Sequence, residues 1–294
     1  MNTGPLRAFL WGMPLFLLAV VVVSASASPW IFEWVDSMAP GRWPFKRVFN
    51  RVLMVTAILF LIPWLRCMGA ASRSKTGISF QRGWWRGLCW GWVIGVAHVS
   101  MLTVLHVSLG AREWNWELTG SRWIGYFFSG WAVAAVEEWI FRGALCLALR
   151  DLSTRALTWV VVLGSLFFAL LHFPQARHMA EGVEWWSGWA MWGDLGMQLL
   201  DGPEVLRRGV GLWMIGVCLC VVALRSGGLW WAVGIHAGWV CAIKSVNRMT
   251  DATVAAESLW WGGHPLDGVV AWLMVGLLAA VCWWWPWKRT ERAV

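Results

Sequence analysis

Charged side chains are scarce in this sequence. Asp, Glu, Lys and Arg make up only 14% of the 294 residues, whereas hydrophobic residues make up 59%. A water-soluble domain carries about a quarter charged residues, so the composition excludes an ordinary soluble protein. We therefore expect an all-α polytopic membrane protein, with most of the chain in or against lipid.

Motifs of soluble enzymes are absent from the sequence as well. It has no H-E-x-x-H, no G-x-S-x-G, no P-loop and no G-x-G-x-x-G. No basic run is interleaved with aromatic residues, so we expect no nucleic-acid partner. The seven cysteines form no C-x-x-C pair. Neither a structural zinc site nor a disulfide framework is therefore indicated.

Tyrosine is nearly absent, with one residue against 30 tryptophans. Tryptophan favours the membrane–water interface, and pairs such as Trp84–Trp85 and Trp230–Trp231 flank apolar runs. A general compositional bias toward Trp, Gly, Ala and Arg explains the count equally well. We therefore place no ligand site on tryptophan alone.

Eight apolar segments are long enough to cross a bilayer as helices, although the fifth and sixth are short. No internal repeat is visible, so we interpret 1–294 as one transmembrane helical domain. The predicted segments are 8–23, 48–65, 88–109, 123–149, 157–172, 210–224, 229–247 and 268–287.

Basic residues cluster in alternate loops between these segments. The stretch 66–87 carries only basic charges, whereas the long segment 172–208 carries several acids. The positive-inside rule then predicts that both termini are cytoplasmic. The loop 24–47, with Arg42 and Lys46, is an exception on the outer side. We expect an integral protein of the bacterial inner (plasma) membrane, in which 172–208 forms the largest outer loop and a partly helical lid.

The N-terminal segment resembles a signal peptide. Arg7 precedes an apolar run, and small residues follow at Ser24–Ser28. Cleavage there would leave seven spans. We expect an uncleaved first helix.

Three ionisable residues interrupt the apolar run 123–149, where charge is costly and rarely without a use. Glu138 and Arg142 are four residues apart on one helix face, which favours an ion pair. Glu137 points about 100° away from Glu138. It is then available as a general base. The alternative is a Glu–Arg pair that holds helices together while Glu137 faces water.

Two histidines lie in later apolar segments. His236 is deep in 229–247, between Gly234 and Gly238, small residues that permit close helix approach. His172 ends the fifth segment, where a lone histidine is usually interfacial. His98 and His106 are eight residues apart on roughly one face of the third segment, and we interpret them as packing or interface residues.

The ordered motifs resemble a known family. Glu137-Glu138-x-x-x-Arg142, then Phe168-x-x-x-His172, then a late-span His236 are similar to the motifs of the CAAX-protease and bacteriocin-processing family. That family is also described as the Abi or type II CAAX prenyl endopeptidase-like family. The resemblance covers 123–246, which includes four predicted helices.

The resemblance implies an all-α intramembrane protease that depends on glutamate. Glu137 and His172 would polarise the attacking water, and His236 would help stabilise the oxyanion. Glu138 and Arg142 would support these residues.

The sequence departs from the family pattern at one position. The family usually continues H-x-x-x-N, with Asn as a further oxyanion donor, whereas this chain has Val240. Losing such a donor costs a hydrolase about 10²–10³ in rate. The departure therefore bears on catalytic competence and not on the fold. Trp239 or Lys244 could substitute as a donor.

The leading hypothesis is an endopeptidase that acts on a membrane-associated peptide or protein substrate within the lipid bilayer. One alternative is a catalytically weak or inactive family member that serves as a membrane binding or immunity protein. Another is a small transporter that uses Glu137, Glu138 and Arg142 as a relay. We expect no cofactor. The alternative is zinc at Glu137, His172 and His236, because carboxylate and imidazole are competent zinc ligands.

Overall fold

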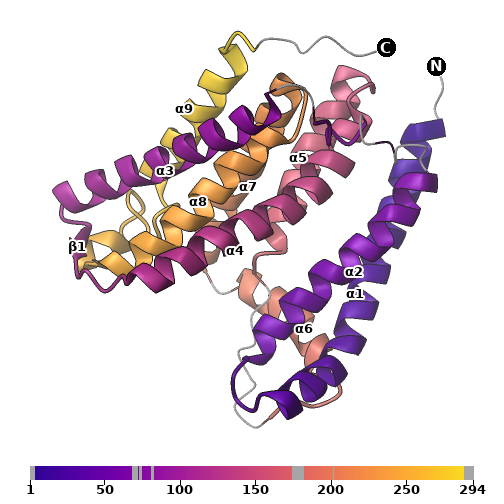
Figure 1. Ribbon diagram of the computed structural model, residues 1–294, viewed down its shortest axis with the longest axis horizontal. Coiled ribbons are helices and arrows are strands. Elements are labelled where there is room, and N and C mark those ends of the chain that lie inside the picture. The colour runs from indigo at the N-terminus through magenta and orange to yellow at the C-terminus, as the bar shows by residue number, and fades with distance from the viewer. Residues whose placement is uncertain are drawn as a thin grey trace. The chain divides into compact units, whose positions relative to one another are not determined.

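The computed structural model describes residues 4–67, 72, 75–80, 83–173, 182–200 and 202–287, and this part is almost entirely helical (Figure 1). Its residues gather into two compact units. The first comprises 1–71 with 170–202, and the second comprises 72–169 with 203–294. The single-domain interpretation stays a prediction.

Some charges used in the topology prediction lie outside the described residues, namely Arg73, Arg82, Glu181, Asp201, Lys288, Arg289 and Arg292.

The first unit contains α1 (Gly4–Met38), α2 (Phe45–Cys67) and α6 (Ser187–Leu200). Helix α1 packs against both α2 and α6. The small residues Ser24–Ser28 lie inside α1, and the Ala25 backbone is so close to Gly188 of α6 that no side chain fits at Gly188. The sequence prediction ended the first helix at 23, but small residues such as Ser and Ala are compatible with a helix. Helix α6 lies in the long segment 172–208, which we expected to be partly helical.

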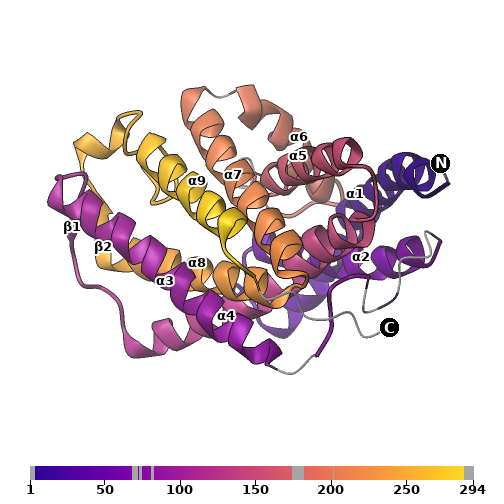
Figure 2. The ribbon, with the colours of Figure 1, turned by 90° about the horizontal axis from the view of Figure 1, so that it is seen from above.

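The second unit contains the other helices. They are α3 (Trp84–Ser108), α4 (Gly120–Glu138), α5 (Thr154–Leu170), α7 (Pro203–Ser226), α8 (Trp230–Met249) and α9 (Val269–Trp284), with a short 3₁₀ turn η3 (Val254–Glu257). Helix α8 packs against α3, α4 and α7, and most of its residues are buried. Figure 2 shows α8 beside α3 and α4. Any polar group on α8 is therefore presented to neighbouring helices.

A seam of glycines brings α3 and α8 into backbone contact. Gly91 and Gly95 of α3 face Gly234 and Gly238 of α8. A Cβ atom on Gly91 would lie 3.1 Å from the Gly234 Cα atom, and one on Gly95 would lie 3.1 Å from the Gly238 Cα atom. Small residues at four-residue spacing permit this approach. The seam fixes the position of α8, and with it that of His236.

Short contacts tie the ends of the second unit together. Strand β1 (Arg112–Trp114), after α3, pairs antiparallel with β2 (Thr250–Ala252), after α8. At the other end, the Leu229 amide donates to the Gly77 carbonyl at 3.3 Å, and the Trp230 indole donates to the Ser79 carbonyl at 2.6 Å. The sequence prediction contained no strands. The loops after α3 and α8 therefore lie at one end of this unit, and the loops before these helices lie at the other end. Helices that alternate in direction require this arrangement.

The predicted apolar segments agree with the helices to within a few residues at most ends. Among the described residues, four helices are long and apolar enough to cross a membrane, and α5 and α9 are shorter apolar helices. The chain is thus an all-α polytopic membrane protein. The segment 123–149 is a correction, because α4 ends at Glu138. A π-helical turn η1 (Trp139–Ala144) and a 3₁₀ turn η2 (Leu147–Leu149) follow. Arg142 lies in the π-helical turn and is buried.

Candidate active site

Glu138, the last residue of α4, is the centre of the polar cluster. Its side chain is fully buried, and its Oε1 atom lies 3.1 Å from Arg142 Nη1 and 2.7 Å from His236 Nδ1. One carboxylate oxygen therefore joins a guanidinium and an imidazole. The ion pair that the four-residue spacing favours is present.

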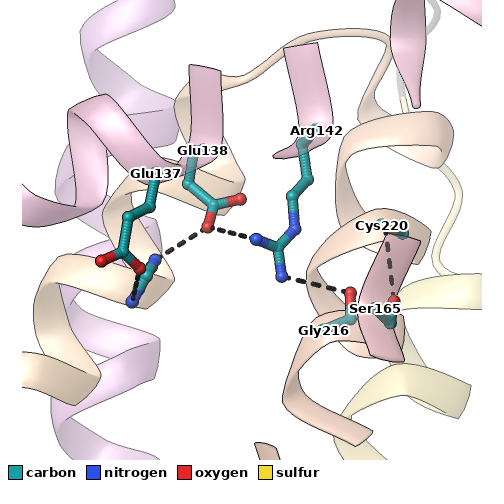
Figure 3. Close-up of polar contacts among 7 residues, drawn as sticks. Glu137, Glu138, Arg142, Ser165, Gly216 and Cys220 are labelled. Atoms are coloured by element: carbon teal, nitrogen blue, oxygen red, sulfur yellow. Dashed lines mark hydrogen bonds and ion pairs between the residues drawn. The ribbon is translucent and has the colours of Figure 1, made fainter. Parts of the chain in front are cut away.

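Arg142 connects this carboxylate to two more helices. Its Nη2 atom donates to the Gly216 carbonyl of α7 at 3.3 Å (Figure 3). Its guanidinium carbon lies 4.4 Å from the ring centroid of Phe168 in α5. A planar guanidinium group can stack on an aromatic ring and donate several hydrogen bonds at the same time, so it suits this position. Arg142 is 1% exposed, and pairing with Glu138 offsets the cost of burying its charge.

His236 of α8 is held between the two glutamates. Its Nδ1 atom contacts Glu138, and its Nε2 atom lies 3.8 Å from Glu137 Oε2. A carboxylate on Nδ1 fixes the orientation of the ring and its tautomer. The Nε2 atom then faces Glu137, as a lone pair in the neutral ring or as an N–H in the imidazolium. The Phe168 ring packs edge-on against His236, at 6.1 Å between centroids.

Glu137 differs from its neighbour in exposure. Its side chain is 18% exposed, whereas that of Glu138 is fully buried. Figure 3 shows the two carboxylates diverging from adjacent backbone positions. This divergence follows from the helical turn angle. The pair thus offers one buried carboxylate that is engaged by Arg142 and His236 and one carboxylate that is partly exposed.

The remaining predicted site residue is His172. It lies in the turn after α5, belongs to the first unit and is exposed. Its contribution to the site stays a prediction. The two histidines predicted to be packing or interface residues contact tryptophans. His98 packs against Trp239 at 5.7 Å between ring centroids, and His106 packs against Trp261 at 5.2 Å.

Val240 lies one turn after His236 on α8 and is half-buried. The Trp239 side chain is buried against His98 of α3, on the side of α8 away from α4. Of the two proposed substitute donors, Lys244 faces α4, where its Nζ atom donates to Ser129 Oγ at 2.8 Å. The structure therefore favours Lys244 over Trp239 as the polar group on the α4 side.

Two contributions to the site were missed from the sequence. Phe168 stacks on Arg142 and packs on His236, and the Gly216 carbonyl accepts from Arg142. Phe168 is part of the F-x-x-x-H motif, and this motif was the sequence signal that Phe168 contributes to the site. A backbone carbonyl such as that of Gly216 has no sequence signal.

The zinc alternative can be tested against the donor atoms. Within the described ranges, no group of three or more His, Cys, Asp or Glu side chains is placed to hold a metal ion. Glu137 and His236 supply two donors, and Glu138 Oε1 is engaged by Arg142 and His236. Catalytic zinc commonly has three protein ligands. A zinc site here would thus require His172 as the third.

Part of the chain is similar to a known protein family. The family model described as Type II CAAX prenyl endopeptidase Rce1-like matches residues 119–242. This range begins at the start of α4 and ends within α8, so it contains Glu137, Glu138, Arg142, Phe168 and His236. No curated protein and no solved structure matches the chain significantly.

Proposed function

Because residues 119–242 match the family model described as Type II CAAX prenyl endopeptidase Rce1-like, we propose that this membrane protein is an intramembrane endopeptidase. It hydrolyses a peptide bond of a membrane-associated peptide or protein. The observation that carries the proposal is the Glu137–His236–Glu138–Arg142 chain of contacts inside a helical bundle.

In this proposal Glu137 is the general base. It is the more exposed of the two glutamates, and its Oε2 atom lies 3.8 Å from His236 Nε2, so a water molecule can be bonded to both. Glu137 takes a proton from that water as the oxygen attacks the carbonyl carbon, and it gives this proton to the amine nitrogen when the C–N bond breaks. His172 assists in polarising the water, as the family resemblance implies.

His236 stabilises the negative charge that develops on the carbonyl oxygen. Its Nδ1 atom is bonded to Glu138, so the ring can donate from Nε2 only as an imidazolium. The imidazolium then has an Nε2–H group on the Glu137 side, where it donates to the oxyanion. Arg142 and Phe168 hold Glu138 and His236 in this geometry. No metal ion or other cofactor takes part in these steps.

A peptide-cleavage assay tests the proposal. The purified protein in lipid vesicles is incubated with membrane-anchored peptides, and new termini are identified by mass spectrometry. The family's name makes peptides with a prenylated C-terminal segment the first to try. We expect cleavage that a chelator leaves unchanged. Loss of cleavage on chelation, restored by zinc, would instead support the alternative site at Glu137, His172 and His236.

Val240 supports a second candidate, a non-catalytic membrane binding or immunity protein, because an apolar side chain stands where the family has a donor. If the protein is a protease, Val240→Asn should raise kcat about tenfold or more, since an amide donor acts where charge develops. Ile243→Asn, also half-buried on α8, is the matched control.

Equal rates for both asparagine variants and the native protein would argue against the proposed oxyanion geometry. If no variant cleaves any peptide while Glu137→Ala cells keep the cellular function, the binding protein is the better assignment.

We further propose that both termini are cytoplasmic in an inner (plasma) membrane. Single cysteines at Lys75 and Ala255, both exposed loop positions, should label from opposite sides in a background without the exposed Cys67 and Cys89. The physical reason is the alternation of basic loops, with Lys75 on the cytoplasmic side. Labelling from the same side would contradict the eight-span topology.

A further inference from the structure

Lys244 is a charged residue of α8 that the proposed reaction does not use. Its ammonium group donates to Ser129 Oγ of α4 at 2.8 Å, and the side chain is half-buried. Charge is costly in a membrane-spanning helix and usually marks a substrate path or a partner. Residue 244 lies just beyond the segment 119–242 that matches the family.

Helices α4 and α8 stay in contact from the Glu138–His236 hydrogen bond as far as Lys244. Glu138 contacts His236 at one end of this seam, and Ser129 contacts Lys244 at the other. Between them Gly130 lies so close to α8 that a Cβ atom would be 2.9 Å from the Ala237 carbonyl oxygen. The two helices are thus antiparallel and stay in contact over this length.

One edge of the seam is half-buried. Ser129, Val133 and Glu137 are half-buried and recur every four residues on α4. Val240 and Lys244 are half-buried on α8, at the same spacing from His236. Residues at this spacing share a helix face. The edge therefore has the Glu137–His236 pair at one end, two valines in the middle and an ammonium group at the other end.

The spacing sets the length of chain that this edge can bind. Ser129 and Glu137 are eight residues apart, which is about 12 Å along a helix. An extended peptide advances about 3.3 Å per residue. A substrate held at the Glu137–His236 pair would reach the ammonium group with the residue three to four positions from the cleaved bond.

We propose that Lys244, supported by Ser129, binds a carboxylate of the substrate three to four residues from the cleaved bond. This inference rests on the proposed endopeptidase function. The carboxylate is either the substrate's C-terminus or an Asp or Glu side chain, since these are the anions of an unmodified peptide. An ammonium–carboxylate contact is a charge-assisted hydrogen bond that both holds and selects the peptide. Lys244 is thus a specificity-determining residue.

Three matched peptides distinguish the two sources of the carboxylate. The first ends in a free carboxylate four residues after the cleaved bond, the second is its C-terminal amide, and the third is the amide with Asp at the fourth position. We expect the native protein to cleave the first, the third or both with kcat/KM about 10- to 100-fold above the amide, mainly through KM. Lys244→Gln should bring this ratio close to one, and Lys244→Arg should retain most of it.

Ser129→Ala separates recognition from a structural role. This variant removes the hydrogen bond between α4 and α8 but keeps the ammonium charge. If Lys244 only joined the helices, Ser129→Ala and Lys244→Gln would lower kcat alike on all three peptides. A native protein without preference for a carboxylate, or a Lys244→Gln variant that keeps the preference, would overturn the proposal.

Binding measurements keep this test independent of catalysis. Affinities of the three peptides are measured for the Glu137→Gln variant, with and without Lys244→Gln, by fluorescence anisotropy. Tighter binding of a carboxylate peptide that depends on Lys244 supports the inference even if no peptide is cleaved. Cleavage that depends on Glu137 but ignores the carboxylate would refute the inference and leave the proposed function intact.

Discussion

Glu137→Gln is expected to abolish peptide hydrolysis while the protein remains folded. Glutamine keeps the shape of the side chain but cannot take a proton from water, and loss of a general base costs about 10²–10⁴ in rate. Glu137 is 18% exposed, so this change strands no fully buried charge. The measurements are the initial rate of cleavage and the thermal unfolding of the protein in detergent.

Glu117→Gln is a matched control, because Glu117 is 62% exposed and its carboxylate lies 4.0 Å from Arg248. It should leave both rate and unfolding temperature unchanged. Full cleavage by Glu137→Gln, in a protein shown to be a protease, would remove Glu137 from the role of base.

Glu138→Gln is expected to act mainly on stability. Its carboxylate is fully buried and joins Arg142 and His236, so the substitution leaves the guanidinium charge without its counter-ion. Breaking a buried ion pair by removing one partner costs about 3–5 kcal/mol in the free energy of unfolding. Equilibrium unfolding of the purified protein measures this loss.

The double variant Glu138→Gln/Arg142→Met provides the control for this reasoning. Removing both charges should recover much of the stability lost in Glu138→Gln, because no buried charge is left uncompensated. A double variant that is less stable than Glu138→Gln would contradict the ion-pair explanation. Activity should stay low in both variants, since His236 loses the carboxylate on its Nδ1 atom.

Of the two adjacent glutamates, only Glu138 is thus expected to lower the stability of the protein when it is replaced by glutamine, and the reason is the direction of the side chains. Glu137 and Glu138 differ by one helical step, which turns one carboxylate into the α4–α8 seam and leaves the other partly exposed. A comparison of the two single variants therefore separates the chemical contribution of this site from its structural one.

The sequence by itself determined the class of the protein and the local part of the site. Scarce charge and eight apolar segments were sufficient for a helical membrane protein, because a chain in lipid must satisfy its backbone polar groups internally. The Glu138–Arg142 pair followed from a spacing of four residues, since helix geometry alone brings such residues together. The order of the motifs around Glu137, Phe168 and His236 predicted the family whose model matches residues 119–242.

Only the tertiary structure decided which distant groups meet. The partner of the His236 imidazole, the packing of Phe168 on Arg142, and the contact of Lys244 with Ser129 join helices that are far apart in the sequence. Helical periodicity predicts which face a residue occupies, but not which helix covers that face. That choice depends on how closely helices approach, and here the glycines of α3 and α8 set the approach by removing the side chains between two backbones.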